Sequence, residues 1–171
     1  MRWLPFQLNP HLPERGIPRA EYLERKFGSR TRTYDRVAAV GATVGIPFAF
    51  DRIAVQPNTV SAHRLLLLAD REGRQDDMAE ALFRAYFTEG ADLTDAATLV
   101  SIAERAGFDR AGVAEYLAGD EDRDAVLAAD RSARESGAIE GVPFFIFNRK
   151  LGVSGAQETA TLLDALERSL A

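Results

Sequence analysis

The sequence has 171 residues, a net charge of −5 and no cysteine, with 21 Lys and Arg against 26 Asp and Glu. That length allows one domain with a buried core, and the scattered, net acidic charge excludes a basic surface for nucleic acid. The absence of cysteine excludes disulfides, thiolate chemistry and cysteine metal sites in the sequence as printed.

The apolar segments are short. The longest candidate for a membrane span is the Leu-Leu-Leu-Leu-Ala run at residues 65–69, which is far below the length that a membrane helix needs. Residues 1–13 lack the apolar region and small-residue cleavage site of a signal peptide. We therefore expect a soluble, cytoplasmic protein with no membrane partner.

In chain order, residues 2–8 come first and predict a strand. Trp3, Leu4, Phe6 and Leu8 fit an extended segment, but Pro5 has no N–H for a ladder and indicates an edge position.

A proline-rich loop follows, and seven helical segments come after it. They are residues 18–28, 31–44, 58–73, 76–88, 94–107, 109–117 and 121–135, each with apolar residues at helical spacing, most with a capping residue or a closing glycine.

Near residue 139 the spacing of the apolar residues changes from that of a helix to that of a strand. Residues 142–147 form a short continuous apolar run, Arg149 and Lys150 form a polar turn, and residues 151–155 form a second short strand. A last helix is predicted over residues 156–170 with Leu163, Leu166 and Leu170 on one stripe. The order is strand, many helices, hairpin, helix.

The segment Gly-Val-Pro-Phe-Phe-Ile-Phe-Asn, residues 141–148, places Pro143 at the mouth of a buried strand. Proline commonly occupies the first residue of a strand, where no ladder bond is lost. The alternative is a cis Val142–Pro143 bond that turns the N–H and C=O of Val142 outward, free to pair with an extended peptide or a glutathione backbone.

Three segments together resemble a known family. Residues 141–148 with the following Gly-Val-Ser-Gly-Ala-Gln strand resemble the cis-proline half of a thioredoxin fold, residues 2–13 resemble the second strand and loop of the DsbA family, and residues 58–65, Asn-Thr-Val-Ser-Ala-His-Arg-Leu, resemble a helix beside its active site. The chain is most similar to the FrnE-like branch. The resemblance implies an α/β, thioredoxin-like fold with a helical insertion over residues 18–136 and a core over residues 1–17 and 137–171.

The resemblance also implies a thiol:disulfide oxidoreductase that acts on a protein or small thiol or disulfide substrate. In this family a first strand leads into a Cys-x-x-Cys helix, and neither is present in the printed sequence. The family's sheet places that strand between the second strand and the hairpin, so we expect two unpaired edges and an uncovered apolar face. No residue of the printed sequence can take the catalytic role of the cysteines, because the attacking species in disulfide exchange is a thiolate.

Three interpretations of this gap stay open. We expect a truncated sequence that starts inside a longer reading frame; the alternatives are a chain that completes its sheet with a partner or as a homodimer, and a degenerate relative. A non-enzymatic peptide-binding or dimerisation module is therefore an alternative function.

The candidate site residues are those of the substrate-binding rim, and no catalytic residue or metal ligand is predicted. They are Val142, Pro143, His63, Asn58 and Asn9. The resemblance places His63 and Asn58 toward the active-site cleft; from sequence alone, Asn58 is an N-cap, Asn9 a turn residue before Pro10, and His63 a partly buried helix residue. His63 and His11 lie too far apart in sequence for a metal-ligand motif.

A glutathione-dependent enzyme is the alternative within the same fold. In kappa-class glutathione transferases and 2-hydroxychromene-2-carboxylate isomerases an acidic residue commonly follows a serine at the position of Ser154 to hold the glutathione amine. Gln157 and its preceding residues depart from that pattern. No cofactor is expected otherwise.

Overall fold

The computed structural model describes residues 1–28, 33–137, 139 and 141–171. Its elements are, in order, β1 (Ile17–Pro18), α1 (Arg19–Phe27), α2 (Thr33–Thr43), the 3-10 turn η1 (Phe50–Arg52), β2 (Val55–Gln56), α3 (Val60–Arg71), α4 (Gln75–Glu89), α5 (Ala96–Arg105), α6 (Arg110–Ala118), α7 (Arg123–Glu135), β3 (Phe144–Phe147), β4 (Leu151–Ser154) and α8 (Thr159–Leu170). All eight predicted helices are present among the described residues, within a few residues of their expected bounds.

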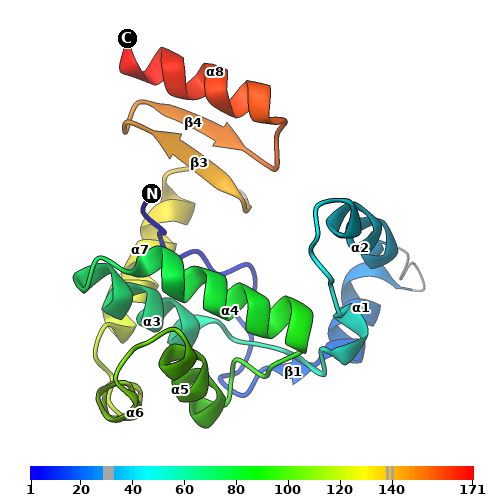
Figure 1. Cartoon of the computed structure of the whole chain (residues 1–171), viewed down its shortest axis with the longest axis vertical. Helices are drawn as coiled ribbons and strands as arrows, with labels where there is room; N and C mark the ends of the chain where they lie inside the picture. Colours follow the sequence, from blue (N-terminus) through cyan, green and yellow to red (C-terminus); the bar gives the residue numbers. More distant parts are fainter. Residues whose placement is uncertain (29–32, 138, 140) are drawn as a thin grey trace.

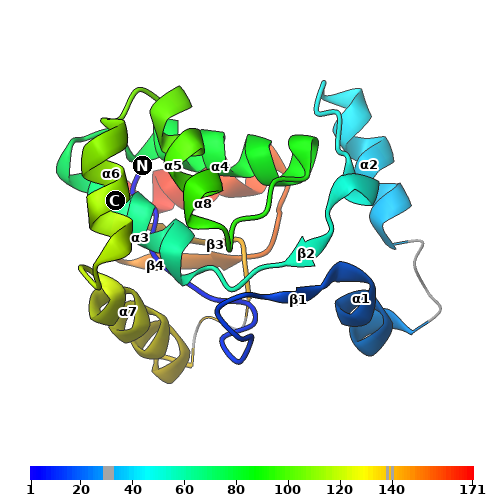
Figure 2. The same cartoon turned by 90° about the horizontal axis from the view of Figure 1, so that it is seen from below.

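Three parts of the molecule are distinct in Figure 1. Helices α3 to α7 form a bundle, α1 and α2 project from it as an arm, and the β3–β4 hairpin with α8 stands at the opposite end from α6. Figure 2 shows the same arm at one side of the molecule, far from α6 and α7. The bundle is thus the body, and the other two parts extend from it.

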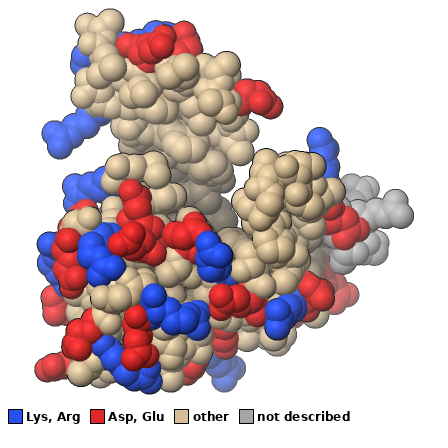
Figure 3. Space-filling view, viewed as in Figure 1, with Lys and Arg blue, Asp and Glu red and all other residues tan. Residues whose placement is uncertain are grey.

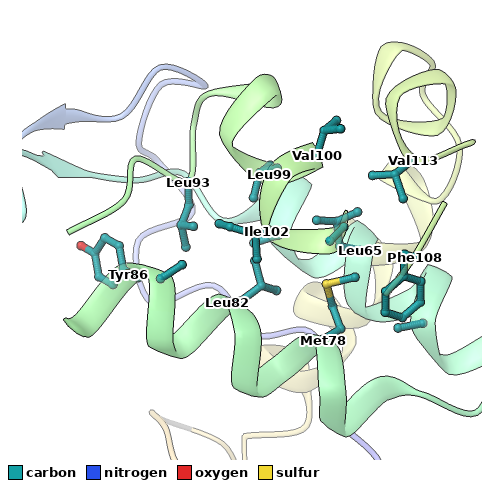
Figure 4. Close-up of a cluster of buried hydrophobic side chains, with 14 of the residues drawn as sticks. Leu65, Met78, Leu82, Tyr86, Leu93, Leu99, Val100, Ile102, Phe108 and Val113 are labelled. Carbon is teal, nitrogen blue, oxygen red and sulfur yellow. The ribbon is translucent and has the colours of Figure 1, made fainter. Parts of the chain in front are cut away.

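The large buried core lies within the bundle. Leu65, Met78, Leu99 and Ile102 are almost completely buried, and they come from α3, α4 and α5. Figure 4 shows these side chains converging between α4 and α5, with Phe108 at the edge of the cluster. In contrast, only Ala165 and Ser169 are buried in the hairpin and α8, so this end has no comparable core.

Capping accounts for several of the helix boundaries. Asp95 accepts a hydrogen bond from the Thr98 N–H at 2.8 Å, and Asp109 accepts one from the Gly112 N–H at 2.6 Å. The sequence offers Thr94 or Asp95 as the cap of the helix predicted over residues 94–107, and the structure uses Asp95; Asp109 caps the helix predicted over residues 109–117. Gly90 closes α4 in the left-handed conformation with a φ of 75°. These ends were predictable because capping is local chemistry.

The strand predicted over residues 2–8 is wrong. No strand is assigned there, because side chains of the bundle take up its backbone groups: the Trp3 N–H donates to the Gln75 Oε1 at 2.7 Å and the Gln7 N–H donates to the Asp130 Oδ1 at 2.7 Å. Pro5 has no N–H to offer. The segment runs across the bundle instead of beside a strand.

The described sheets are two separate antiparallel pairs. The short strands β1 and β2 pair Ile17 with Gln56, a pairing that no sequence pattern indicates, and β3 pairs with β4. Asn148 and Arg149 both have positive φ in the hairpin turn, where the sequence predicts a turn. Asn148 also donates to the Ser169 carbonyl at 3.0 Å and so ties the hairpin to α8.

Candidate functional site

The hairpin presents an open edge beside Val142 and Pro143. The Val142–Pro143 peptide bond is cis, and the Gly155 N–H donates to the Pro143 carbonyl at 2.9 Å. Val142 is 48% exposed. Among the described residues, β3 pairs only with β4, so its other edge carries no ladder.

The alternation of an antiparallel ladder gives the direction of the β3 backbone groups. Since the Gly155 N–H bonds the Pro143 carbonyl, position 143 faces β4. Phe144 and Ile146 are one and three positions farther along, so their N–H and C=O groups face the open edge. An extended segment laid beside β3 would therefore find donors and acceptors on two residues.

Large apolar side chains accompany this edge. Ile146 is 51% exposed on β3, and α8 exposes three leucines at helical spacing: Leu163, Leu166 and Leu170. A stripe spaced by three and four residues is the pattern by which a helix contacts another helix. The sequence predicted that stripe for α8, but the structure leaves it largely uncovered among the described residues.

Asn58 has two structural partners. Its Oδ1 accepts from the Val60 N–H at 3.0 Å at the start of α3, and its Nδ2 donates to the Leu12 carbonyl at 2.9 Å. It therefore fastens the proline-rich loop to the helix start. Asn9 lies in that loop, where its carbonyl accepts from the Leu12 N–H at 3.2 Å. The structure thus links the segments that carry Asn58 and Asn9.

His63 is partly buried on α3. Its Nδ1 lies 2.8 Å from the Thr59 carbonyl oxygen, so Nδ1 carries the proton in the neutral ring and Nε2 keeps the lone pair. Burial lowers the pKa of His63, while the bond to Thr59 and the charge of Asp130 act in the opposite sense. His63 is therefore a neutral imidazole at neutral pH.

A polar cavity of about 500 Å³ adjoins the start of α3. Asn58, Ser61, Arg64 and Arg123 line it, together with Glu14. Val142 and Pro143 are not among the lining residues, so the cavity and the β3 edge are separate features in the described part of the chain. No group of three or more His, Cys, Asp or Glu that could hold a metal ion occurs among the described residues.

Several polar side chains are buried that no sequence pattern marks as buried. Arg64, Gln75 and Asp130 are 3%, 5% and 6% exposed. Gln75 donates to the Trp3 carbonyl and accepts from the Trp3 N–H, so one amide holds a backbone segment 72 residues away. The one available signal was the position of Arg64, a charged residue directly before the apolar run at residues 65–69, because a charge beside buried residues must find partners inside the fold.

The model of the DSBA-like thioredoxin domain matches residues 1–167. The chain belongs to the DSBA-like thioredoxin domain family. The α/β, thioredoxin-like fold with its helical insertion, expected from the sequence, is thereby confirmed.

Two solved structures are similar to this DSBA-like chain. A probable DsbA oxidoreductase from Streptomyces coelicolor has 32% sequence identity and a TM-score of 0.85, over 96% of this chain and 73% of that one. A protein from Nitrosomonas europaea, provisionally assigned as a protein disulfide isomerase, has 18% identity and a TM-score of 0.64, over 82% of this chain and 73% of that one. The second likeness concerns the fold alone. A search of curated proteins found no match.

None of the described helices has both the length and the apolar composition that crossing a membrane requires.

Proposed function

We propose that the protein serves in thiol:disulfide exchange, as a DsbA-like oxidoreductase of the FrnE-like branch. In this proposal Val142, next to Pro143, holds an extended segment of the substrate, and the β3 edge holds a strand of the enzyme's own redox unit. The observation that carries the proposal is the unpaired edge of β3, with its outward backbone groups at Phe144 and Ile146 beside the Val142–Pro143 bond.

The printed sequence has no thiol, so the redox centre belongs to another segment. We propose that a strand leading into a Cys-x-x-Cys helix pairs with β3, and that its helix covers Leu163, Leu166 and Leu170 on α8. A strand beside β3 would satisfy the free backbone groups, and a helix beside α8 would bury the leucine stripe. Ile146 and the three leucines are exposed, and among the described residues the hairpin and α8 bury only Ala165 and Ser169.

The exchange itself needs two thiols and one disulfide. One thiolate of the Cys-x-x-Cys pair attacks a sulfur of the substrate disulfide and releases a substrate thiolate, which takes up a proton. The second cysteine then attacks the mixed disulfide and releases the other substrate thiolate. The substrate disulfide is reduced and the cysteine pair is oxidised, and the reverse sequence oxidises a substrate dithiol.

The test uses the protein purified from its natural source. Intact mass and peptide mapping are expected to show a Cys-x-x-Cys segment joined to or bound by this chain, and the preparation is expected to accelerate insulin reduction by dithiothreitol. The cysteine-free 171-residue chain alone should give only the background rate. A natural preparation without any cysteine, or without rate above background, would overturn the proposal.

An edge variant tests the role of β3. Ile146→Pro removes an N–H that faces the open edge while the ladder to β4 keeps its bonds. In the natural protein it should lower the insulin rate, whereas Ile146→Val, which keeps the N–H, should not. Equal insulin rates for the two variants would show that the activity does not need the open edge of β3.

A further inference from the structure

Arg19 is a buried cation at the joint between the arm and the bundle. It is the first residue of α1 and is 8% exposed. Its Cζ lies 4.8 Å from the centroid of the Tyr34 ring on α2. Its Nη1 donates to the Gln56 Oε1 on β2 and lies 3.5 Å from the Tyr86 hydroxyl on α4. Four elements therefore meet at one positive charge.

No negative charge balances Arg19 within the described residues. Most Lys and Arg side chains lie on the surface, and Figure 3 shows them interspersed with Asp and Glu over the visible face of the body. Arg19 forms no ion pair with a described carboxylate, and Asp92, whose charge acts on Tyr86, binds Thr94 instead. Burial raises the pKa of Tyr86 to about 12, so its hydroxyl stays neutral. Because an unpaired buried cation is costly, an anion from outside the chain would stabilise this joint.

The Arg19 guanidinium also has an unused hydrogen-bonding edge. Nη1 is the nitrogen that binds Gln56, whereas Nε is buried without a partner. Nη2 has no partner among the described residues either, but it keeps contact with solvent. The N–H groups of Nε and Nη2 point in parallel and form the fork that binds both oxygens of a carboxylate or phosphate. The unsatisfied edge therefore has the donor geometry of an oxyanion site that is open at one end.

Arg64 shows how a buried arginine with a purely structural role is satisfied in this protein. Its Nε donates to the Glu121 carbonyl, and its Nη2 donates to the carbonyls of Tyr116 and Gly119, so the same edge of the guanidinium is fully used. Arg19 is similarly buried but has no such acceptors. The Nε and Nη2 edge of Arg19 is thus available to an acceptor from another molecule.

The surroundings of Arg19 favour a negative charge. The centroid of the Tyr22 ring lies 5.6 Å from the Arg19 Cζ and 5.3 Å from the Lys26 Nζ, and this Nζ donates to the Tyr22 hydroxyl at 2.8 Å. Lys26 forms no ion pair with a carboxylate in the described part of the chain. Arg19 also lies in the first turn of α1, at the positive end of the helix dipole. Two cations and a helix start therefore act in the same sense.

We propose that Arg19 binds an oxyanion group of a ligand, a carboxylate or a phosphate, which accepts hydrogen bonds from Nε and Nη2 at the joint between the arm and the bundle. Ligand sites are common where two structural units meet. The bound anion neutralises a charge that α1, α2 and α4 share, so it stabilises the attachment of the arm to the bundle. This site is separate from the β3 edge and does not depend on the redox proposal.

Calorimetric titration of the full natural protein tests the site, with sodium phosphate and sodium acetate as separate probes and the ionic strength held constant with sodium chloride. At least one anion should bind and raise the melting temperature, and the tighter of the two identifies the class of ligand. Arg19→Lys keeps the charge but loses the fork, so it should weaken binding at least about tenfold. Arg25→Lys is the matched control, because Arg25 is exposed and pairs with Glu21 on the same helix, and it should leave the affinity unchanged.

Nuclear magnetic resonance of the unmodified protein tests the binding atoms without relying on a variant that must fold. The Nε–H signal of Arg19, assigned through its own backbone resonances, should shift with anion concentration along the calorimetric binding curve, while the signal of Arg25 stays in place. A protein that binds neither anion at constant ionic strength would overturn the proposal. So would anion binding that leaves the Arg19 Nε–H signal unchanged or that Arg19→Lys does not weaken.

Discussion

The Arg64 side chain and Tyr116 hold each other across two helices. The Arg64 Nη2 donates to the Tyr116 carbonyl at 2.6 Å, and the Tyr116 hydroxyl donates to the Arg64 carbonyl at 2.9 Å. The guanidinium also donates to the carbonyls of Gly119 and Glu121, both at 2.7 Å. A buried cation thus satisfies the orphan carbonyls at the end of α6 and stabilises the negative end of its dipole.

Replacing Arg64 by Met should destabilise the fold strongly. The change leaves several carbonyls without donors, and a loss of about 3 kcal/mol in the free energy of unfolding is expected. Urea denaturation monitored by circular dichroism measures it. Arg110→Met is the matched control, because Arg110 pairs with Glu104 on an exposed surface and should cost under about 1 kcal/mol. Equal losses for the two variants would contradict the role assigned to Arg64.

His63 should make the stability depend on pH. Its pKa is lowered in the folded protein, chiefly by burial, so the unfolded chain binds a proton more readily. Stability is therefore full above the unfolded pKa of about 6.5 and falls as the pH drops below that value. His63→Gln should reduce this loss between pH 7.5 and pH 5 in thermal melts. His11→Gln, at an exposed histidine, should leave the loss as it is in the unmodified protein.

Gly41 should resist substitution even though it lies within a helix. Alanine is ordinarily better than glycine there by about 1 kcal/mol, but its Cβ would lie 2.5 Å from the Phe48 ring. We expect Gly41→Ala to lower the melting temperature, and Phe48→Leu to lessen that effect when the two changes are combined. A melting temperature raised by Gly41→Ala would show that the ring moves aside freely.

The cap of α5 should be sensitive to acid. The Thr98 hydroxyl and N–H both donate to Asp95 and lower the pKa of its carboxyl, so the cap contributes fully above pH 4 and is lost as the pH falls below that value. Asp95→Ala should cost about 1 kcal/mol at pH 7 and less near pH 2.5. Asp95→Asn keeps an acceptor that does not titrate, so its cost should be smaller and should vary less with pH. Denaturant titrations at the two pH values measure all three proteins.

The sequence by itself determined the local elements and the family. Helix starts at Asp95 and Asp109, the close of α4 at Gly90, and the hairpin near residues 144–154 follow from capping, glycine conformation and apolar period. These signals lie within a few residues of the structure they specify. The resemblance of the segment around Pro143 to the DsbA family likewise predicted a thioredoxin-like fold, which the match to the family model confirms.

Tertiary structure decided the contacts between distant segments. Gln75 and Asp130 take up the backbone of residues 3 and 7, and for that reason the expected first strand does not form. Arg64 binds carbonyls more than 50 residues away, and nothing near it in the sequence marks those acceptors. The exposure of the β3 edge also depends on which surfaces the rest of the chain covers. Periodicity can show which face of an element is apolar, but only the folded arrangement shows whether that face is buried.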